Sequence, residues 1–198
     1  SNVFKVNRSY VYEHGTLKYQ YNPGTINTPQ LTKGVNWHTI SATTVAAETY
    51  NNLEVTGATT YTLGGSFAAA NVTVGAAATL SPASSITGSR TLTVNGTLVV
   101  KASTFDGNYT GFVTTTLNSG SVVKYNGTAA QAIKVLPYAN LTMDNSSGAS
   151  LAGNVAVTGT LTLTSGNISA DPDTLSIGSA GSVVHTSGHV IGTLKKSY

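Results

Sequence analysis

The sequence contains no cysteine. Neither a disulfide framework nor a thiolate metal site can therefore form. This composition is compatible with an oxidising exterior but does not require one. The chain is 198 residues long, which is enough for one elongated domain or two small ones.

Charged side chains are also scarce. Ten Lys and Arg and seven Asp and Glu make up 9 % of the chain, where about 25 % is usual for soluble proteins. The net charge of +3 is dispersed, and Lys195-Lys196 is the only local basic pair. A surface that follows nucleic-acid phosphates needs clustered basic residues, so we expect no nucleic-acid partner. Thr, Ser, Asn and Gly must supply solubility, which suits a secreted or cell-surface protein.

Long apolar runs are missing as well. None approaches the roughly 18 residues that a membrane-spanning helix needs, so we expect no membrane span. The first residues, Ser1–Lys5, do not form a signal peptide, and we expect any export signal to have been removed or to lie outside this sequence. No apolar pattern at helical spacing is sustained, which predicts almost no helix.

The chain instead contains a repeat. In Val155-Ala-Val-Thr-Gly-Thr-Leu-Thr-Leu163, apolar residues alternate with small or polar ones. The phrase starts again twenty residues later at Leu175 (175−155), and an earlier pair of phrases starts at Val72 and Leu92 with the same spacing (92−72). A fixed period near twenty is typical of repeat architectures.

A second pair of similar segments, further apart in the sequence, supports a repeat of about the same length. Tyr50-Asn-Asn-Leu53 matches Tyr138-Ala-Asn-Leu141 at an offset of 88 residues (138−50 and 141−53). Eighty-eight is four periods of 22 (88/4), close to the local spacing. We interpret the two spacings as one unit of about 20–24 residues, with four units between the matched strands.

These spacings predict a right-handed parallel β-solenoid with about 20–24 residues per coil, because each coil stacks the same inward positions on the coil below. An antiparallel β-sandwich is the alternative, since Asn95-Gly96 between two apolar alternations is a strong hairpin signal. In the solenoid, residues 37–198 would form about seven or eight coils. The predicted core ladder consists of Val72, Val74, Leu92, Val94, Val155, Val157, Leu161, Leu163, Leu175 and Ile177.

The first 36 residues differ from the rest. Their alternating tyrosines flank Glu13-His-Gly-Thr16, which predicts two strands joined by a short turn. We therefore divide the chain into a tyrosine-rich β-hairpin over 1–36, acting as an N-terminal cap or assembly arm, and solenoid repeats over 37–198 that we expect to continue beyond this sequence. These tyrosines are also candidate glycan contacts, although such rings more often cover the open end of a core. They are Tyr10, Tyr12, Tyr19 and Tyr21.

No group of residues forms a convincing catalytic motif. Cleavage of a polysaccharide needs two acidic groups on one site, and Asp144 and Asp171 are 27 residues apart (171−144), more than one coil. We therefore predict a protein that is not an enzyme. The segment Phe105–Phe112 resembles an insertion or a wider corner, and within it Asp106, Tyr109 and Phe112 are the local candidates for contact with a glycan.

Metal and ice-binding patterns are equally incomplete. His185 and His189 are four residues apart, which on a strand is about 13 Å, so we predict no metal site and no cofactor. Thr91-Leu-Thr93 and Thr160-Leu-Thr-Leu-Thr164 resemble the threonine ladders of ice-binding solenoids. Because the pattern does not recur in every coil, we do not expect a flat array, and exposed threonine is ordinary on a β face.

Three phrases resemble a known group of repeats: Tyr138–Met143, Val155–Ile168 and Gly188–Gly192. They are similar to repeats in large secreted surface proteins of the Bacteroidota, which are adhesin-like. The resemblance covers about 118–198 well and 37–100 loosely. It implies export by the type IX route with a separate C-terminal sorting domain. It also implies O-glycosylation at Thr174, within Asp173-Thr-Leu175.

Taken together, the sequence predicts a non-enzymatic extracellular or cell-surface module that serves as a stalk, adhesin or filament subunit. The expected partners are other copies of itself or neighbouring domains at the solenoid edges, and surface glycans. A carbohydrate-binding or polysaccharide-cleaving β-helix is the alternative function. An ice-binding solenoid is a further alternative.

Overall fold

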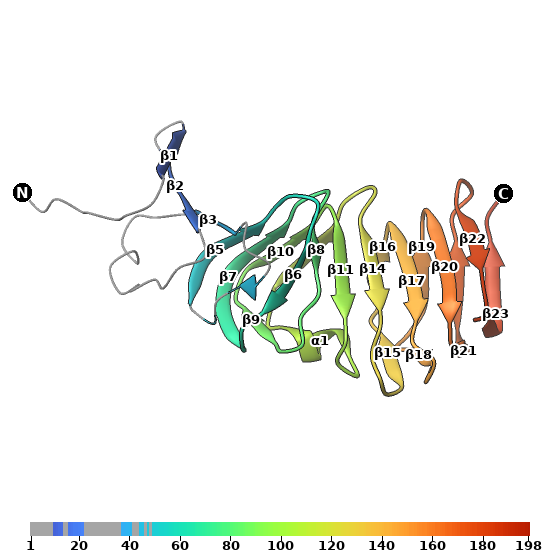
Figure 1. Ribbon diagram of the computed structural model, residues 1–198. Coiled ribbons are helices and arrows are strands. Elements are labelled where there is room, and N and C mark those ends of the chain that lie inside the picture. Colours follow the sequence, from blue (N-terminus) through green and yellow to red (C-terminus); the bar gives the residue numbers. More distant parts are fainter. Residues whose placement is uncertain (1–9, 14–15, 22–36, 41–43, 46, 48) are drawn as a thin grey trace, which may run out of the picture.

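The computed structural model describes residues 10–13, 16–21, 37–40, 44–45, 47 and 49–198, and the side chains among them from residue 44 onward. The prediction of a β-solenoid is confirmed. The chain forms a parallel β-solenoid of about eight turns, with almost no helix (Figure 1). Among the described residues, no helix has the length and apolar character that a membrane crossing requires.

Three sheets run along the solenoid. A nine-stranded sheet contains β1 (Tyr10–Glu13), β2 (Thr16–Tyr21), β3 (Trp37–Ile40), β5 (Tyr50–Val55), β7 (Phe67–Val74), β10 (Thr91–Val94) and β13 (Thr114–Leu117), with β9 (Ile86–Gly88) and β12 (Tyr109–Thr110) attached beside β7. An eight-stranded sheet contains β4 (Thr44–Val45), β6 (Thr60–Leu63), β8 (Thr79–Leu80), β11 (Thr97–Val100), β14 (Val122–Tyr125), β17 (Asn140–Asp144), β20 (Thr160–Ser165) and β22 (Ser182–His185). A six-stranded sheet contains β15 (Gln131–Ile133), β16 (Pro137–Tyr138), β18 (Ala149–Leu151), β19 (Val155–Val157), β21 (Ile168–Ile177) and β23 (Val190–Lys196).

The direction of the strands excludes the sandwich. Among the described strands, β1 and β2 pair antiparallel and every other pair is parallel. Asn95-Gly96 is therefore a solenoid corner between β10 and β11, which belong to different sheets. Gly96 is needed there because a Cβ atom would lie 2.2 Å from the carbonyl oxygen of Gly75 in the coil below. The hairpin interpretation of this dipeptide is wrong.

The twenty-residue period is real, but coil length varies. Val72 pairs with Leu92 and Val155 with Leu175, as the spacing predicted. In the eight-stranded sheet the repeat is 18 residues from Val123 to Leu141 (141−123) and 25 from Leu98 to Val123 (123−98). Some coils are therefore shorter and others longer than the predicted 20–24 residues.

The two similar segments 88 residues apart, Tyr50–Leu53 and Tyr138–Leu141, do not occupy equivalent positions in the solenoid. Leu53 lies in the nine-stranded sheet, whereas Leu141 lies in the eight-stranded sheet. The offset therefore moves from one face of the solenoid to another, because the coil lengths between the two leucines are unequal. The interpretation of the two phrases as matched strands is therefore wrong.

The core is a continuous ladder of inward apolar side chains. All ten residues predicted for it are 3 % exposed or less. Between them, outward positions such as Thr93 and Thr162 are half-buried. A strand with this alternation turns its apolar side chains inward, and β-branched threonine suits the exposed pleat.

Replacing Leu161 with alanine should destabilise the solenoid strongly. Leu161 is fully buried and pairs with Leu141 on one side and Val183 on the other, so the variant leaves a cavity in the ladder. We expect the free energy of unfolding to fall by about 2–5 kcal/mol, measured by denaturant unfolding. Thr162→Ala, at the neighbouring outward position, is the control and should change it by about 0.5 kcal/mol or less. Equal losses in the two variants would show that Leu161 is not a core residue.

Candidate functional site

The carboxylates that the sequence offered for catalysis lie on different sheets. Asp144 ends β17 in the eight-stranded sheet, and Asp171 and Asp173 lie in β21 of the six-stranded sheet. Asp144 accepts from Lys124 at 2.6 Å, and this hydrogen bond is the main cause that lowers the pKa of its carboxyl group. Within the described part of the chain, no three His, Asp or Glu residues are grouped so that they could hold a metal ion.

The predicted wide corner exists, and it contains a helix. The four-residue helix α1 (Phe105–Asn108) begins at Thr104, whose hydroxyl accepts from the backbone N–H of Gly107. Thr104 bridges to Ala132 in the next coil, whereas β12, directly after α1, pairs with β9 in the coil before. The inserted helix thus separates two segments that pair with coils on opposite sides, which explains the 25-residue repeat.

Polar groups tie this insertion to the coils around it. The buried amide of Asn108 accepts from the backbone N–H groups of Lys101 and Ala102 and donates to the carbonyl oxygen of Ser84. On the outside, Lys134 pairs with Asp106 at 2.6 Å and lies 5.3 Å from the centre of the Phe105 ring. Asp106 is therefore held in an ion pair.

The structure places the predicted glycan-contact residues very differently. Tyr109 is 1 % exposed and its hydroxyl donates to the carbonyl oxygen of Val99, so it has no ring face for a sugar and that prediction is wrong. Phe112 is half-buried and its ring packs directly over Gly88, where a Cβ atom would lie 2.2 Å from Cδ1. Contact of Phe112 with a glycan stays a prediction.

The N-terminal tyrosines lie in the predicted pair of strands. β1 and β2 pair antiparallel, with Tyr10 opposite Tyr19 and Tyr12 opposite Leu17. Tyr21 lies in β2, opposite Ile40 of β3. Their side chains are outside the described part of the structure, so their contact with glycans stays a prediction. The same holds for O-glycosylation at Thr174, which is half-buried in β21 with its backbone N–H bound to Asn154.

Two further tyrosines are buried as a hydrogen-bonded pair beside the inserted helix. The hydroxyl groups of Tyr125 and Tyr138 lie 3.0 Å apart. Tyr138 donates to the carbonyl oxygen of Lys134, and the backbone N–H of Lys134 donates to Tyr125. Burial raises the pKa of Tyr125 to about 12 and raises the pKa of Tyr138 well above its usual value. These groups are structural because neither reaches the surface.

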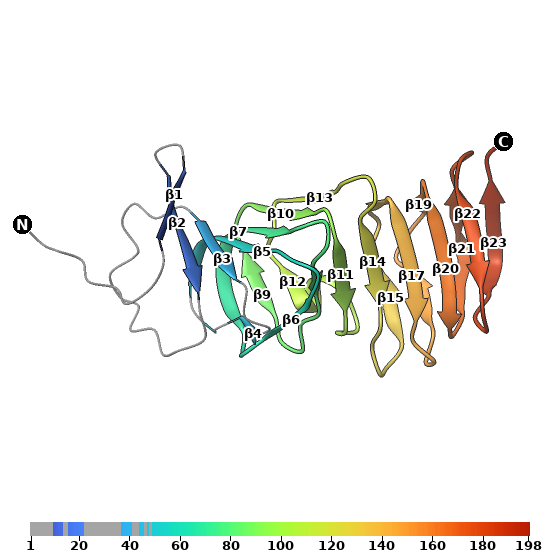
Figure 2. The same cartoon turned by 45° about the horizontal axis from the view of Figure 1, so that its top comes forward.

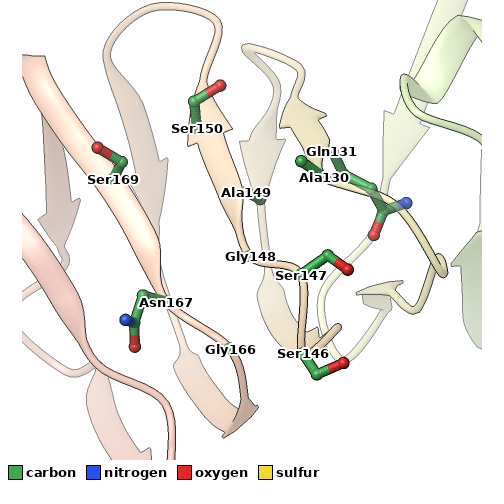
Figure 3. A pocket seen from close by; sticks show the side chains of 10 residues that line it. All are labelled: Ala130, Gln131, Ser146, Ser147, Gly148, Ala149, Ser150, Gly166, Asn167 and Ser169. Carbon is green, nitrogen blue, oxygen red and sulfur yellow. The ribbon is translucent and has the colours of Figure 1, made fainter.

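A shallow hollow opens where the chain turns from the eight-stranded to the six-stranded sheet (Figure 3). Its volume is about 380 Å³, and serine, asparagine, glycine and alanine residues line most of it. The corner at Gly166-Asn167 has two residues between β20 and β21, whereas the preceding corner, 145–148, has four. The hollow is lined by residues at and beside these two corners and by Ala130 and Gln131 of the coil before.

The polar groups of this hollow already have partners or point apart. Both ends of the buried Gln131 amide are bonded, the oxygen to Gly127 and Asn145 and the nitrogen to Val100 and Ala102. The hydroxyl of Ser147 donates to Thr128. Figure 3 shows Asn167 and Ser169 on the opposite side from Ser147 and Gln131, with their polar ends pointing in different directions. The hollow results from corner geometry and does not form a convergent binding site.

The C-terminal end of the solenoid presents apolar side chains. Val183 and Leu194 occupy inward positions, opposite Leu161 and Leu175, yet they are 42 % and 43 % exposed. Val184 and Ile191 add outward apolar surface on the same coil. We call these four residues the open end. At the other end of the eight-stranded sheet, Val45 is fully buried.

Two ladder positions at the open end carry polar residues. His185 lies opposite Leu163, and Lys196 lies opposite Ile177. The Lys196 ammonium group donates to the carbonyl oxygen of Gly181 at 2.6 Å. The sequence contains a signal for this exposed end. When the twenty-residue period is followed through β22 and β23, His185 and Lys196 fall at positions where the repeat has apolar residues.

No family model matches the chain, and neither a curated protein nor a solved structure matches it.

Alkaline pH should unfold the protein because of its buried tyrosines. Above pH 10 the unfolded chain loses the phenolic proton of Tyr125, while the folded chain keeps it up to about pH 12. The unfolded state then binds fewer protons, so the free energy of unfolding falls by about 1.4 kcal/mol per pH unit for each such group. Chemical unfolding at a series of pH values measures this slope. Tyr125→Phe should make it shallower, whereas Tyr198→Phe, at a fully exposed position, should not. A stability that is constant across this pH range would contradict the expectation.

Proposed function

We propose that this chain is a non-enzymatic structural module of an extracellular surface protein, a stalk or adhesive rod that joins further β-structure through its open end. The observation that carries the proposal is the exposure of Val183 and Leu194 at inward ladder positions. Interior equivalents of these residues, Leu161 and Leu175, are fully buried.

An exposed ladder and an exposed strand edge favour association. β22 and β23 each pair with one strand of the coil before, and the described chain has no strand on their other side. Such edges present unpaired N–H and C=O groups to any strand that can align with them. A further β-coil would satisfy these groups and bury Val183 and Leu194 together. The natural partner is therefore another copy of this chain or a neighbouring β-domain.

The composition of the solenoid surface supports an extracellular location. Its 9 % of charged residues is well below the usual share, and Thr, Ser and Asn provide most of the outward positions on the sheets. The repeats also resemble those of secreted surface proteins of the Bacteroidota.

Location can be tested directly on the source cells. An antibody raised against the purified protein should label intact cells, because the proposed module is extracellular. The control is an antibody against a cytoplasmic protein, which should label only permeabilised cells. Labelling by both antibodies only after permeabilisation would rule the location out.

The open end can be tested by its self-association. We expect the wild-type protein to associate with rising concentration, and Val183→Asp combined with Leu194→Asp to weaken this by about tenfold or more, which is about 1.4 kcal/mol. Sedimentation equilibrium provides the measurement. The matched control is Val113→Asp. Val113 is 81 % exposed but lies between β12 and β13, several coils before the open end. A wild-type protein that stays monomeric, or an equal effect of the control, would contradict the role of the open end.

A further inference from the structure

One face of the nine-stranded sheet carries a regular array of threonine and asparagine. The segments Thr91-Leu-Thr-Val-Asn95 and Thr114-Thr-Thr-Leu-Asn118 have the same outward pattern, Thr, Thr, Asn. We call their outward side chains, together with those of Asn71 and Thr73 on β7, the threonine plane. Figure 2 shows β7, β10 and β13 side by side along the upper edge of the solenoid.

The residues of the plane lie in exact register from coil to coil. Thr91 pairs with Thr114, and Thr93 pairs with Thr116 on one side and Thr73 on the other. Neighbouring strands are about 4.8 Å apart, and successive outward residues on one strand are about 6.6 Å apart. The hydroxyl and methyl groups therefore repeat in two directions.

Several features hold this array rigid. Threonine is β-branched, so few χ1 rotamers are open to it. Thr73, Thr93 and Thr116 form the central row of the plane. A pair of hydrogen-bonded amides lies on each side of this row: Asn118 donates to Asn95, and Asn71 donates to Asn52, both at 2.7 Å. A surface whose side chains are already ordered loses little entropy when it binds.

The plane is also uncharged. Two charged residues border it: Glu54 lies opposite Thr73, and the exposed Arg90 directly precedes Thr91. The other faces differ, because the eight-stranded sheet carries the Lys124–Asp144 ion pair and the six-stranded sheet carries the outward Lys195. The plane consists of Thr and Asn and contains no aromatic side chain. Sugar rings usually stack on aromatic faces, so this composition does not favour a glycan as the ligand.

From this geometry we propose that the threonine plane binds ice. Ice is a neutral lattice that repeats in two directions, so it matches a rigid, uncharged and periodic surface better than a single small ligand does. The threonine hydroxyl groups form hydrogen bonds to lattice water, while the methyl groups between them hold water in fixed positions without competing for it. Charged side chains would impose their own hydration, and the plane contains none.

This activity goes beyond a structural role, and it does not depend on the open end. From the sequence alone we expect no flat array, because the Thr-x-Thr phrases do not recur in every coil. The structure shows a different arrangement: Thr160-Leu-Thr162 lies on the eight-stranded sheet, while Thr114-Thr-Thr116 lies beside Thr91-Leu-Thr93.

The test is inhibition of ice recrystallisation by the full chain, with thermal hysteresis as a second readout. We expect activity in the wild type and a loss of about tenfold or more in Thr93→Tyr, which places a bulky ring in the centre of the plane. Thr162→Tyr, a matched outward change on the eight-stranded sheet, should keep full activity. Glu54→Thr should increase activity, because it extends the central row by one uncharged strand. Circular dichroism and thermal unfolding establish that each variant is folded.

The outcomes separate the proposal from its rivals. Absence of both ice effects in the folded wild type overturns it. Loss of activity in Thr162→Tyr instead of Thr93→Tyr overturns it as well, since the active face would then be the eight-stranded sheet. If the wild type shows no ice effect but Thr93→Tyr abolishes its retention on an insoluble polysaccharide, the plane binds glycan and the ice proposal is wrong. A loss in Thr93→Tyr together with a gain in Glu54→Thr supports it, whatever the self-association experiments show.

Discussion

Stacking of inward apolar side chains between neighbouring coils is the interaction on which this structure depends. Each coil alone is a few short strands that cannot bury an apolar face, and its stability comes from the coils on either side. The ladder through Leu141 and Leu161 is fully buried for this reason. At Val183 the same ladder reaches the surface, where this inward apolar side chain is 42 % exposed.

The ladder leaves the corners and outer faces free to vary. Coil length changes from 18 to 25 residues without breaking the stacking, because the longest coil folds its extra residues into α1 and packs Phe105 and Tyr109 into the core. The longest coil contains the helix α1, and buried polar groups such as Asn108 bond to the backbone of adjacent coils there. Hydrogen-bonded amides are needed at such places, since a buried backbone group without a partner is costly.

The repeat made most of the fold predictable. An alternation with a twenty-residue period identified parallel strands and all ten ladder residues, since inward positions recur in register. The period could not show which face a phrase occupies. The two similar segments at Leu53 and Leu141 lie on different faces, because unequal coils shift the phase. Tyr109 was misplaced for a related reason: the insertion that seemed to widen a surface corner buries that ring instead. The threonine plane depends on the pairing of β10 with β13, whose 23-residue spacing (114−91) departs from the period.

The orientation of the strands also determines how the module responds to tension. The strands lie across the long axis, and the hydrogen bonds between coils lie along it (Figure 1). A pull along the axis at the C-terminal end therefore loads the bonds of β23 first and those of earlier coils only afterwards. A coil of about 20 residues that comes free adds about 70 Å of extended chain. A rod with this geometry lengthens in steps under load, absorbing mechanical work one coil at a time while the remaining coils stay folded.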